Sequence, residues 1–270
     1  MEIKAYAKIN ITLDVLRKRP DGYHDLRGVM CSISIYDNVS IEPAEDIRFS
    51  CNIPLPENNT AAKAARLFME ETGKGAYIRL EKRIPSEAGL GGASADAAAV
   101  LRGMNRLYGN PLPESRLYKL GLLVGADVPF CLMGGCAVAE GVGEILTPLP
   151  VPRLDLVIVK GSSGVSTAAL FKSLRLPVEH PDTDGAIAAI QRKDIAVLAP
   201  LCKNALEPPA TALLPEIAEH KKLLMQSGAL SAFMTGSGAA VVGIFKDAEA
   251  ARRGAEDLSH LPFVYVCSTL

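Results

Sequence analysis

Apolar and polar residues alternate near the start of the chain, between positions 3 and 15. The apolar phase consists of Ile3, Ala5, Ala7, Ile9, Ile11, Leu13 and Val15. The polar phase consists of Lys4, Tyr6, Lys8, Asn10, Thr12 and Asp14. A period of two is typical of a β-strand with one buried face. After a turn at Pro20–Gly22 the alternation resumes over residues 29–35, which predicts a second strand beside the first.

Helical and strand patterns then follow one another as far as residue 140. A helix capped by Asn59 is expected to end near Gly73. An apolar phase at residues 76–84 predicts another strand, and Lys82 falls in its inward phase, where a charge needs a partner or a pocket. The other elements expected in this half are helices at 94–108 and 113–125 and a strand at 136–140.

The chain changes character at Pro150 and Pro152, two prolines near the end of a strand. This change predicts a domain boundary, with one domain at residues 1–150 and a second at 151–270. The second half is expected to hold a strand at 154–159, several helices, a strand pair within 233–245, a helix at 248–258 and a last strand at 263–267. This mixture is typical of an α+β domain of the split βαβ type.

The composition fits a compact protein of mixed helices and strands. Hydrophobic residues make up 49% of the 270 residues and charged residues 22%, proportions that exclude intrinsic disorder. The formal net charge of −1 predicts no broad attraction to nucleic acid or to an anionic membrane. An anionic ligand would therefore be held by local donors.

The location expected for the chain is the cytoplasm. Its N-terminus lacks the apolar core of a signal peptide, and no apolar stretch has the length needed to span a bilayer. The six cysteines are interpreted as reduced packing residues. Cys131 and Cys136, the closest in sequence, are the only disulfide candidates.

A glycine-rich segment at residues 85–94, PSEAGLGGAS, lies between an expected strand and an expected helix. Glycine lets the backbone approach an anion closely, and the free N–H groups at a helix start form an anion site that needs no basic side chain. Ser94 can cap the helix or donate to phosphate. The segment matches neither a P-loop nor a dinucleotide-binding fingerprint. On its own it is also compatible with a flexible turn that enters a packed helix.

Several segments, in the same order along the chain, resemble the GHMP kinases, which include galactose, homoserine, mevalonate and phosphomevalonate kinases. The glycine-rich segment resembles their ATP loop. The other matching segments are residues 7–10, 19–24, 125–130, 139–144 and 235–239. They favour one branch, whose substrate is a cytidine diphosphate derivative of methylerythritol in the non-mevalonate route to isoprenoids. Ala93, Ala95 and Asp96 depart from the residues usual in the loop but leave its amide donors in place.

The resemblance implies an α+β, two-domain GHMP kinase fold, with an N-terminal ribosomal-protein-S5-domain-2-like domain and a C-terminal ferredoxin-like domain. It also implies that Lys8 and Asp127 are catalytic. Asp127 would accept the proton of the acceptor hydroxyl, while Lys8 would keep Asp127 ionised and stabilise the transferred phosphoryl group. From the residues alone, Lys8 is also compatible with a solvated strand face, and Asp127 with a turn or N-cap aspartate between Gly125 and Pro129.

Two binding sites are implied by the same resemblance. The residues that would bind the nucleotide are Pro85, Gly89, Leu90, Gly91, Gly92, Ala93 and Ser94, with Asn59 and Lys82 near the adenine. The residues that would bind the second substrate are Asn10, Tyr23, His24, Met30, Phe171, Thr235, Gly236, Ser237 and Gly238. Tyr23 and His24 would contact the cytosine, with Phe171 and Met30 as walls of its pocket.

ATP is therefore expected as co-substrate, together with Mg²⁺ held mainly by ATP and water, with Ser94 as a candidate ligand. No Asp/Glu cluster suggests a metal site built by the protein. The expected partner is a small molecule, bound by a monomer or homodimer. Two alternatives stay open: a GHMP kinase with another acceptor, such as homoserine or a mevalonate derivative, and a non-catalytic nucleotide-binding module.

Overall fold

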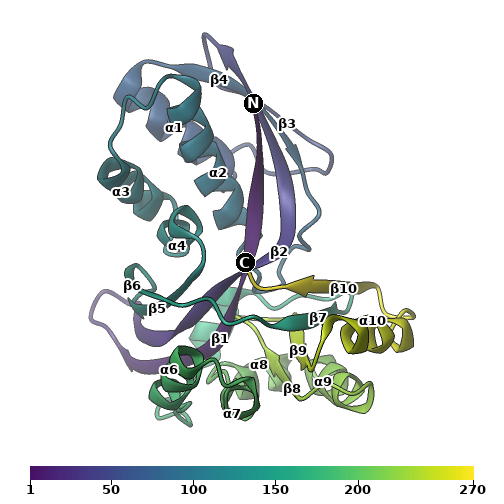
Figure 1. Cartoon of the computed structure of the whole chain (residues 1–270). Coiled ribbons are helices and arrows are strands. Elements are labelled where there is room, and N and C mark those ends of the chain that lie inside the picture. Colours follow the sequence, from purple (N-terminus) through teal and green to yellow (C-terminus); the bar gives the residue numbers. More distant parts are fainter. The chain divides into compact units, whose positions relative to one another are not determined.

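The computed structural model describes all residues, 1–270, and forms two compact units whose segments alternate along the chain (Figure 1). The first unit comprises Met1–Ala7, Ile35–Ile84 and Gly91–Gly134. The second unit comprises Lys8–Ser34, Pro85–Leu90 and Gly135–Leu270. The strands β1 (Glu2–Lys18) and β2 (His24–Ala44) each contribute residues to both units. The boundary at residue 150 stays a prediction.

The first unit packs helices on one face of a sheet. Its strands are the N-terminal part of β1, the C-terminal part of β2, β3 (Arg48–Cys51) and β4 (Gly75–Glu81). They lie in the order β3-β4-β2, and β1 pairs with β2. Its helices are α1 (Thr60–Thr72), α2 (Gly92–Leu107), α3 (Glu114–Val124) and α4 (Val128–Met133). Figure 1 shows the four helices on the same side of these strands. Buried side chains such as Ile41, Ile78 and Phe68 join the two layers.

Local signals explain where α1 begins and ends, as predicted. The Asn59 carboxamide oxygen accepts the N–H of Ala62 at 2.9 Å, and Gly73 ends the helix in the left-handed conformation. The start of α2 was predicted two residues too late, because its N-cap is Gly91 and not Ser94. Gly91 has a φ of 69° and makes no side-chain capping bond, which leaves Ser94 inside the first turn.

The second unit contains the other part of the six-stranded sheet and a separate four-stranded sheet. The remaining parts of β1 and β2 join β5 (Cys136–Gly141) and β6 (Ile145–Leu149), with β5 between β2 and β6. The other sheet is antiparallel, in the order β10-β7-β9-β8. Its strands are β7 (Asp155–Lys160), β8 (Ser231–Met234), β9 (Val241–Phe245) and β10 (Phe263–Ser268). These strands confirm the elements predicted after residue 150.

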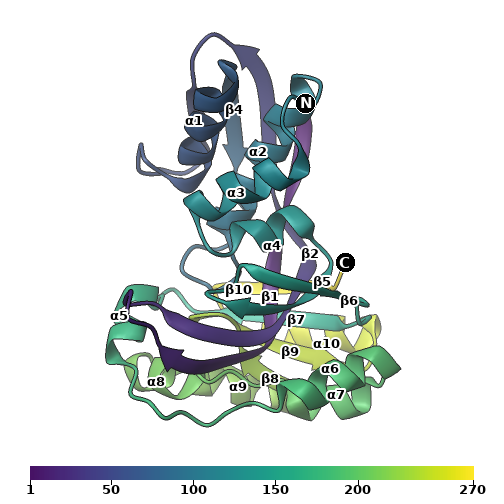
Figure 2. The same cartoon turned by 90° about the vertical axis from the view of Figure 1, so that its left-hand side faces the viewer.

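Six helices complete the second unit. They are α5 (Thr167–Ser173), α6 (Thr183–Arg192), α7 (Ile195–Leu201), α8 (Glu207–Leu213), α9 (Glu216–Gln226) and α10 (Ala248–Asp257). Helices α9 and α10 pack against the sheet of β7–β10, as Figure 2 shows, and Leu224 and Leu258 are buried against Val157 and Val241. None of the helices in the chain is long and apolar enough to cross a membrane.

Cysteine chemistry follows the prediction in part. None of the six cysteines forms a disulfide, and their reduced state stays a prediction. Cys131, however, is not the partner of Cys136 in the sheet: Cys31 lies opposite Cys136 in the register of β2 and β5. The thiol hydrogen bond to Cys136, followed by burial, raises the pKa of Cys31.

The short elements β3, β6 and α4 were not predicted, because four to six residues carry too little periodicity.

Candidate active site

The polar face of β1 is buried in the second unit, contrary to the prediction of one buried face. Lys8 is 4% exposed and Asn10 is 5% exposed. The Lys8 ammonium donates to the Asn10 carboxamide oxygen at 2.7 Å. The interpretation of Lys8 as a solvated surface charge is therefore wrong. A buried ammonium on a strand face is a functional candidate, because such a charge is costly unless it is paired or used.

The turn after β8 lies directly against this part of β1. The backbone N–H of Asn10 donates to the Thr235 hydroxyl at 2.9 Å, and Thr235 is fully buried. Asn204 holds the turn from the other side, since its carboxamide donates to the carbonyls of Met234 at 2.9 Å and Gly236 at 2.8 Å. The Ser237 and Thr167 hydroxyls lie 2.6 Å apart. Asn204 and Thr167 were not predicted as site residues.

The first part of the glycine-rich loop, residues 85–90, meets the same turn. The N–H groups of Ala239 and Ala240 donate to the carbonyls of Glu87 and Ala88 at 3.0 and 3.1 Å. Gly89 has a φ of 72°, and a Cβ there would lie 2.1 Å from the Thr235 carbonyl oxygen.

The loop also meets β1. The Leu90 carbonyl accepts the N–H of Lys8 at 2.9 Å. Three segments far apart in the sequence therefore converge within the second unit: the start of β1, the loop and the turn after β8.

The second part of the loop, residues 91–94, begins α2 in the first unit. The first bond of this helix runs from the N–H of Ala95 to the Gly91 carbonyl at 2.9 Å, so the N–H groups of Gly92, Ala93 and Ser94 have no acceptor within the helix. Together with the helix dipole, such amides attract an anion.

The turn that precedes α4 lies close to this helix start. A Cβ on Gly125 would lie 3.9 Å from the Ser94 hydroxyl. Asp127 follows in the same turn, half-buried at the N-cap position of α4, and its side chain makes no capping hydrogen bond to that helix. Capping therefore does not account for the Asp127 carboxylate.

Asn59 is engaged locally at the start of α1. Its oxygen caps the helix, and its amino group donates to the Pro56 carbonyl at 2.9 Å. The neighbouring Thr60 hydroxyl donates to the Ala93 carbonyl at 2.7 Å, which ties the start of α1 to the start of α2. An adenine contact by Asn59 stays a prediction.

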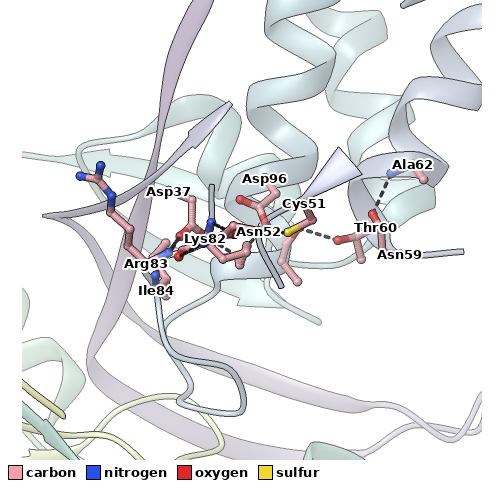
Figure 3. Close-up of polar contacts among 11 residues, drawn as sticks. Asp37, Cys51, Asn52, Asn59, Thr60, Ala62, Lys82, Arg83, Ile84 and Asp96 are labelled. Carbon is pink, nitrogen blue, oxygen red and sulfur yellow. Dashed lines mark hydrogen bonds and ion pairs between the residues drawn. The ribbon is translucent and has the colours of Figure 1, made fainter. Parts of the chain in front are cut away.

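Lys82, whose inward position predicted a partner or a pocket, forms ion pairs with two carboxylates (Figure 3). Its side chain is 8% exposed, and its ammonium pairs with the Asp37 carboxylate and, at 2.6 Å, with Asp96. Burial acts to lower the pKa of Lys82, but attraction to Asp96 and Asp37 outweighs it, so the pKa is raised. Burial raises the pKa of Asp96 to about 7, against the attraction of Lys82 and with the repulsion of Asp37.

The residues proposed for a cytosine base lie in the second unit. The rings of His24 and Phe171 are 5.0 Å apart and tilted by 31°, so Phe171 on α5 does face His24. Burial, followed by repulsion from Lys18, lowers the pKa of His24. Tyr23 is 64% exposed, whereas Met30 is buried within β2.

Comparisons with known proteins agree with this arrangement. Sequence models of the GHMP kinases N terminal domain and the GHMP kinases C terminal match residues 59–135 and 186–261. A 4-diphosphocytidyl-2-C-methyl-D-erythritol kinase of Lachnoclostridium phytofermentans is 44% identical over 263 residues, covering 94% of this chain and 90% of that protein. The enzyme of the same name from Caldicellulosiruptor saccharolyticus is 44% identical over 268 residues, covering 96% and 92%.

Solved structures show the same likeness. A crystal structure of 4-(cytidine 5'-diphospho)-2C-methyl-D-erythritol kinase has a TM-score of 0.87 and 35% identity, and covers 100% of this chain and 99% of that chain. A homoserine kinase from Cytophaga hutchinsonii has a TM-score of 0.75 at 20% identity, covering 100% and 97%, which shows the shared fold alone.

The fold and the matched domain models define a GHMP kinase, a phosphotransferase. Identity of 44% over nearly the whole length is more specific than that class. The chain belongs to the 4-diphosphocytidyl-2-C-methyl-D-erythritol kinase family. The GHMP kinase fold predicted from the sequence is confirmed.

Proposed function

We propose that this chain transfers the γ-phosphoryl group of ATP to the 2-hydroxyl of 4-diphosphocytidyl-2-C-methyl-D-erythritol, a step in making isoprenoid precursors. The convergence of β1, the glycine-rich loop and the turn after β8 supports the proposal, because backbone hydrogen bonds join Lys8 to Leu90 and Asn10 to Thr235. Membership of the GHMP kinases implies ATP as co-substrate. The names of the relatives support the choice of acceptor.

The glycine-rich loop would hold the phosphates of ATP. Donors for their oxygens would be the main-chain N–H groups at the start of α2 and those of residues 86–90, since Pro85 has none. Asn59 and Lys82 would lie near the adenine. Phosphoryl transfer depends on positioning and on stabilising charge, and main-chain amides around the phosphates would do both.

Lys8 and Asp127 would perform the transfer. Asp127 would take the proton of the 2-hydroxyl as its oxygen bonds to the γ-phosphorus and the bond to the bridging β,γ-oxygen breaks, releasing ADP. The Lys8 ammonium would stabilise the charge on the transferred group. The Asn10 carboxamide accepts from the Lys8 ammonium at 2.7 Å and would orient it. Asn10 would thereby lie near the acceptor.

The cytidine end of the substrate would bind at His24 and Phe171. The two rings lie 5.0 Å apart and are tilted by 31°, and the pyrimidine would pack beside them as a third ring. Tyr23 is exposed and would contact the base directly. Met30 is buried and would form the floor of the pocket. The turn formed by Thr235, Gly236, Ser237 and Gly238 would approach the phosphates.

Mg²⁺ is proposed as the companion of ATP, where it would neutralise charge on the triphosphate. The chain holds no group of three His, Cys, Asp or Glu side chains that could cage a metal ion. This donor set fits an ion that keeps its ligands on phosphate and water, and the Ser94 hydroxyl at the start of α2 is the protein ligand we propose.

The remaining features are also proposals. They are a domain boundary at residue 150, a monomeric or homodimeric state, a cytoplasmic location and a single small-molecule partner. The net charge of −1 supports the proposal that no nucleic acid is bound.

An acceptor panel tests the function. Purified protein, ATP and Mg²⁺ are mixed with the cytidine substrate, homoserine or mevalonate, and ADP release is followed by a coupled assay. We expect ADP only with the cytidine substrate. Turnover of homoserine or mevalonate alone would overturn the acceptor, and ATP binding without turnover of any acceptor would favour a non-catalytic module.

A further inference from the structure

One ammonium group joins the two ends of the glycine-rich loop. Lys82 lies where the chain leaves β4 and enters the loop, and Asp96 lies in α2 just after the loop ends. The Lys82 ammonium donates to Asp96 at 2.6 Å across 14 residues of sequence. A Cβ on Gly92, the first residue of α2, would lie 3.3 Å from the same ammonium. The charge is therefore placed beneath the first turn of the helix (Figure 3).

Asp37 fixes the entrance of the loop. This fully buried residue of β2 accepts the N–H groups of Arg83 at 2.5 Å and Ile84 at 2.8 Å with one carboxylate oxygen. The other oxygen accepts from the Lys82 ammonium. Both carboxylate oxygens of Asp37 accept hydrogen bonds from residues 82–84, so this aspartate fixes the strand that enters the loop.

Asp96 is held differently. One of its oxygens accepts from Lys82, while the other, Oδ1, is buried without a hydrogen-bond partner. An ammonium at the N-terminal end of a helix meets the positive end of the dipole, so it is unfavourable there unless carboxylates compensate it. Asp37 and Asp96 provide that compensation. The arrangement has no role in the sheet or helix ladders and lies next to the amides that would cradle phosphate.

We propose that Asp37 and Asp96 are positioning residues for nucleotide binding: through Lys82 they hold the start of α2 in a fixed place relative to the strand that enters the glycine-rich loop. This inference rests on the proposed role of the loop as the ATP phosphate site. It gives Lys82 a function besides the adenine contact. Removing the link to Asp96 frees the helix start, and the amides then lose part of their alignment before ATP arrives.

The test compares three variants of the whole chain. Asp96→Ala breaks the link, and Asp96→Asn keeps an oxygen that accepts from Lys82. Asn105→Ala is the matched control, because Asn105 is buried on the same helix and its side chain bonds the Leu112 backbone at the opposite end. Each variant is measured for its Kd for a non-hydrolysable ATP analogue and for its Tm.

We expect Asp96→Ala to weaken binding of the analogue by about tenfold and Asp96→Asn to restore most of that loss. Asn105→Ala should lower Tm and leave the Kd within about twofold of the parent. Equal weakening by Asp96→Ala and Asn105→Ala would overturn the proposal, because it would show only general destabilisation. An unchanged Kd for Asp96→Ala would overturn it as well.

A second readout separates this inference from the proposed function. Hydrogen exchange of the amides of residues 95–98 is followed in the free protein, without nucleotide. The link predicts faster exchange there in Asp96→Ala than in the parent, and no change in Asn105→Ala. If the parent fails to bind the analogue, the proposed function is wrong, and the exchange result still decides whether Asp96 holds the helix start. Unchanged exchange in Asp96→Ala would refute the positioning role itself.

Discussion

The backbone N–H of Asn10 donates to the Thr235 hydroxyl at 2.9 Å, although 225 residues separate them. Both residues are buried, and the Asn10 carboxamide in turn accepts from the Lys8 ammonium at 2.7 Å. The place of the proposed catalytic lysine thus depends on a turn near the other end of the chain. The second unit is therefore required for the placement of the Lys8 side chain.

Thr235→Val tests this dependence. Valine has the same shape but no hydroxyl, so the buried N–H of Asn10 loses its acceptor, and the free energy of unfolding should fall by about 1–3 kcal/mol. We also expect a lower kcat, since Asn10 would no longer hold Lys8 in one place. Thermal unfolding and steady-state assays measure both effects. Thr235→Ser keeps the hydroxyl and should behave like the parent; a Val variant with parental kcat would show that the bond is structural only.

Asp127→Asn tests the proposed base. The carboxamide is isosteric but cannot take a proton, and general-base catalysis contributes typically about 10²–10⁴-fold, so kcat should fall by that order. The Asp127 side chain does not cap α4, and loss of its charge should leave the helix intact. Circular dichroism and the Kd for ATP should therefore match the parent. Turnover close to that of the parent by the folded variant would remove Asp127 from this role.

Local features of the sequence were sufficient to predict much of the fold. Asn59 and Gly73 mark the ends of α1 because capping involves only neighbouring residues. The alternation in β1 predicted the strand and also the exposure of its polar face, which holds for Lys4 and Tyr6 but is wrong from Lys8 to Asp14. Period two gives the two faces of a strand; whether the second face is solvated depends on what packs there, as Thr235 does against Asn10.

The candidate site was predicted where its residues lie in recognisable motifs. Asn204 was missed because a single asparagine between helices has no pattern, and only the folded chain brings it to the Met234 and Gly236 carbonyls. Lys82 shows the intermediate case. Its place in an apolar phase predicted a partner, but Asp37 and Asp96 become its partners only through tertiary structure.

The buried triad predicts how stability changes with pH. With Asp37, Lys82 and Asp96 all ionised, its net charge is negative in a buried place. Burial raises the pKa of Asp96 from 3.8 to about 7, although the attraction of Lys82 acts against this rise. Between these values the folded protein binds one more proton than the unfolded protein, so its stability falls as pH rises and the loss is complete above about 7.

Asp96→Asn should remove this dependence. A pKa unit corresponds to about 1.4 kcal/mol, so the parent should lose up to about 3 kcal/mol between about pH 5 and about pH 8, and the variant clearly less. Urea unfolding at both pH values measures the difference. Glu71→Gln is the control: the hydrogen bond from Arg116 lowers the pKa of Glu71, which is ionised throughout this range. Equal losses in parent and Asp96→Asn would contradict the prediction.

Phe171→Leu tests the proposed cytosine pocket. Leucine keeps apolar volume but removes the ring that lies 5.0 Å from His24, and aromatic pairs contribute about 0.5–1.5 kcal/mol beyond their buried area. We expect the KM for the cytidine substrate to rise by about 2–10-fold, with the KM for ATP unchanged. Phe171→Tyr keeps the ring and should restore the parental KM. If both KM values rise together, the effect is one of general folding and the pocket lies elsewhere.

Gly89→Ala tests the close approach of the loop to the turn after β8. At a φ of 72°, alanine costs roughly 1–2 kcal/mol, and its Cβ would lie 2.1 Å from the Thr235 carbonyl oxygen, so the two segments must separate. Gly73→Ala isolates the first of these effects, because Gly73 has a φ of 68° with nothing within 4 Å of the added Cβ. Both variants should lose stability, but only Gly89→Ala should also lose ATP binding and turnover. Parental ATP affinity in Gly89→Ala would mean that this contact does not shape the phosphate site.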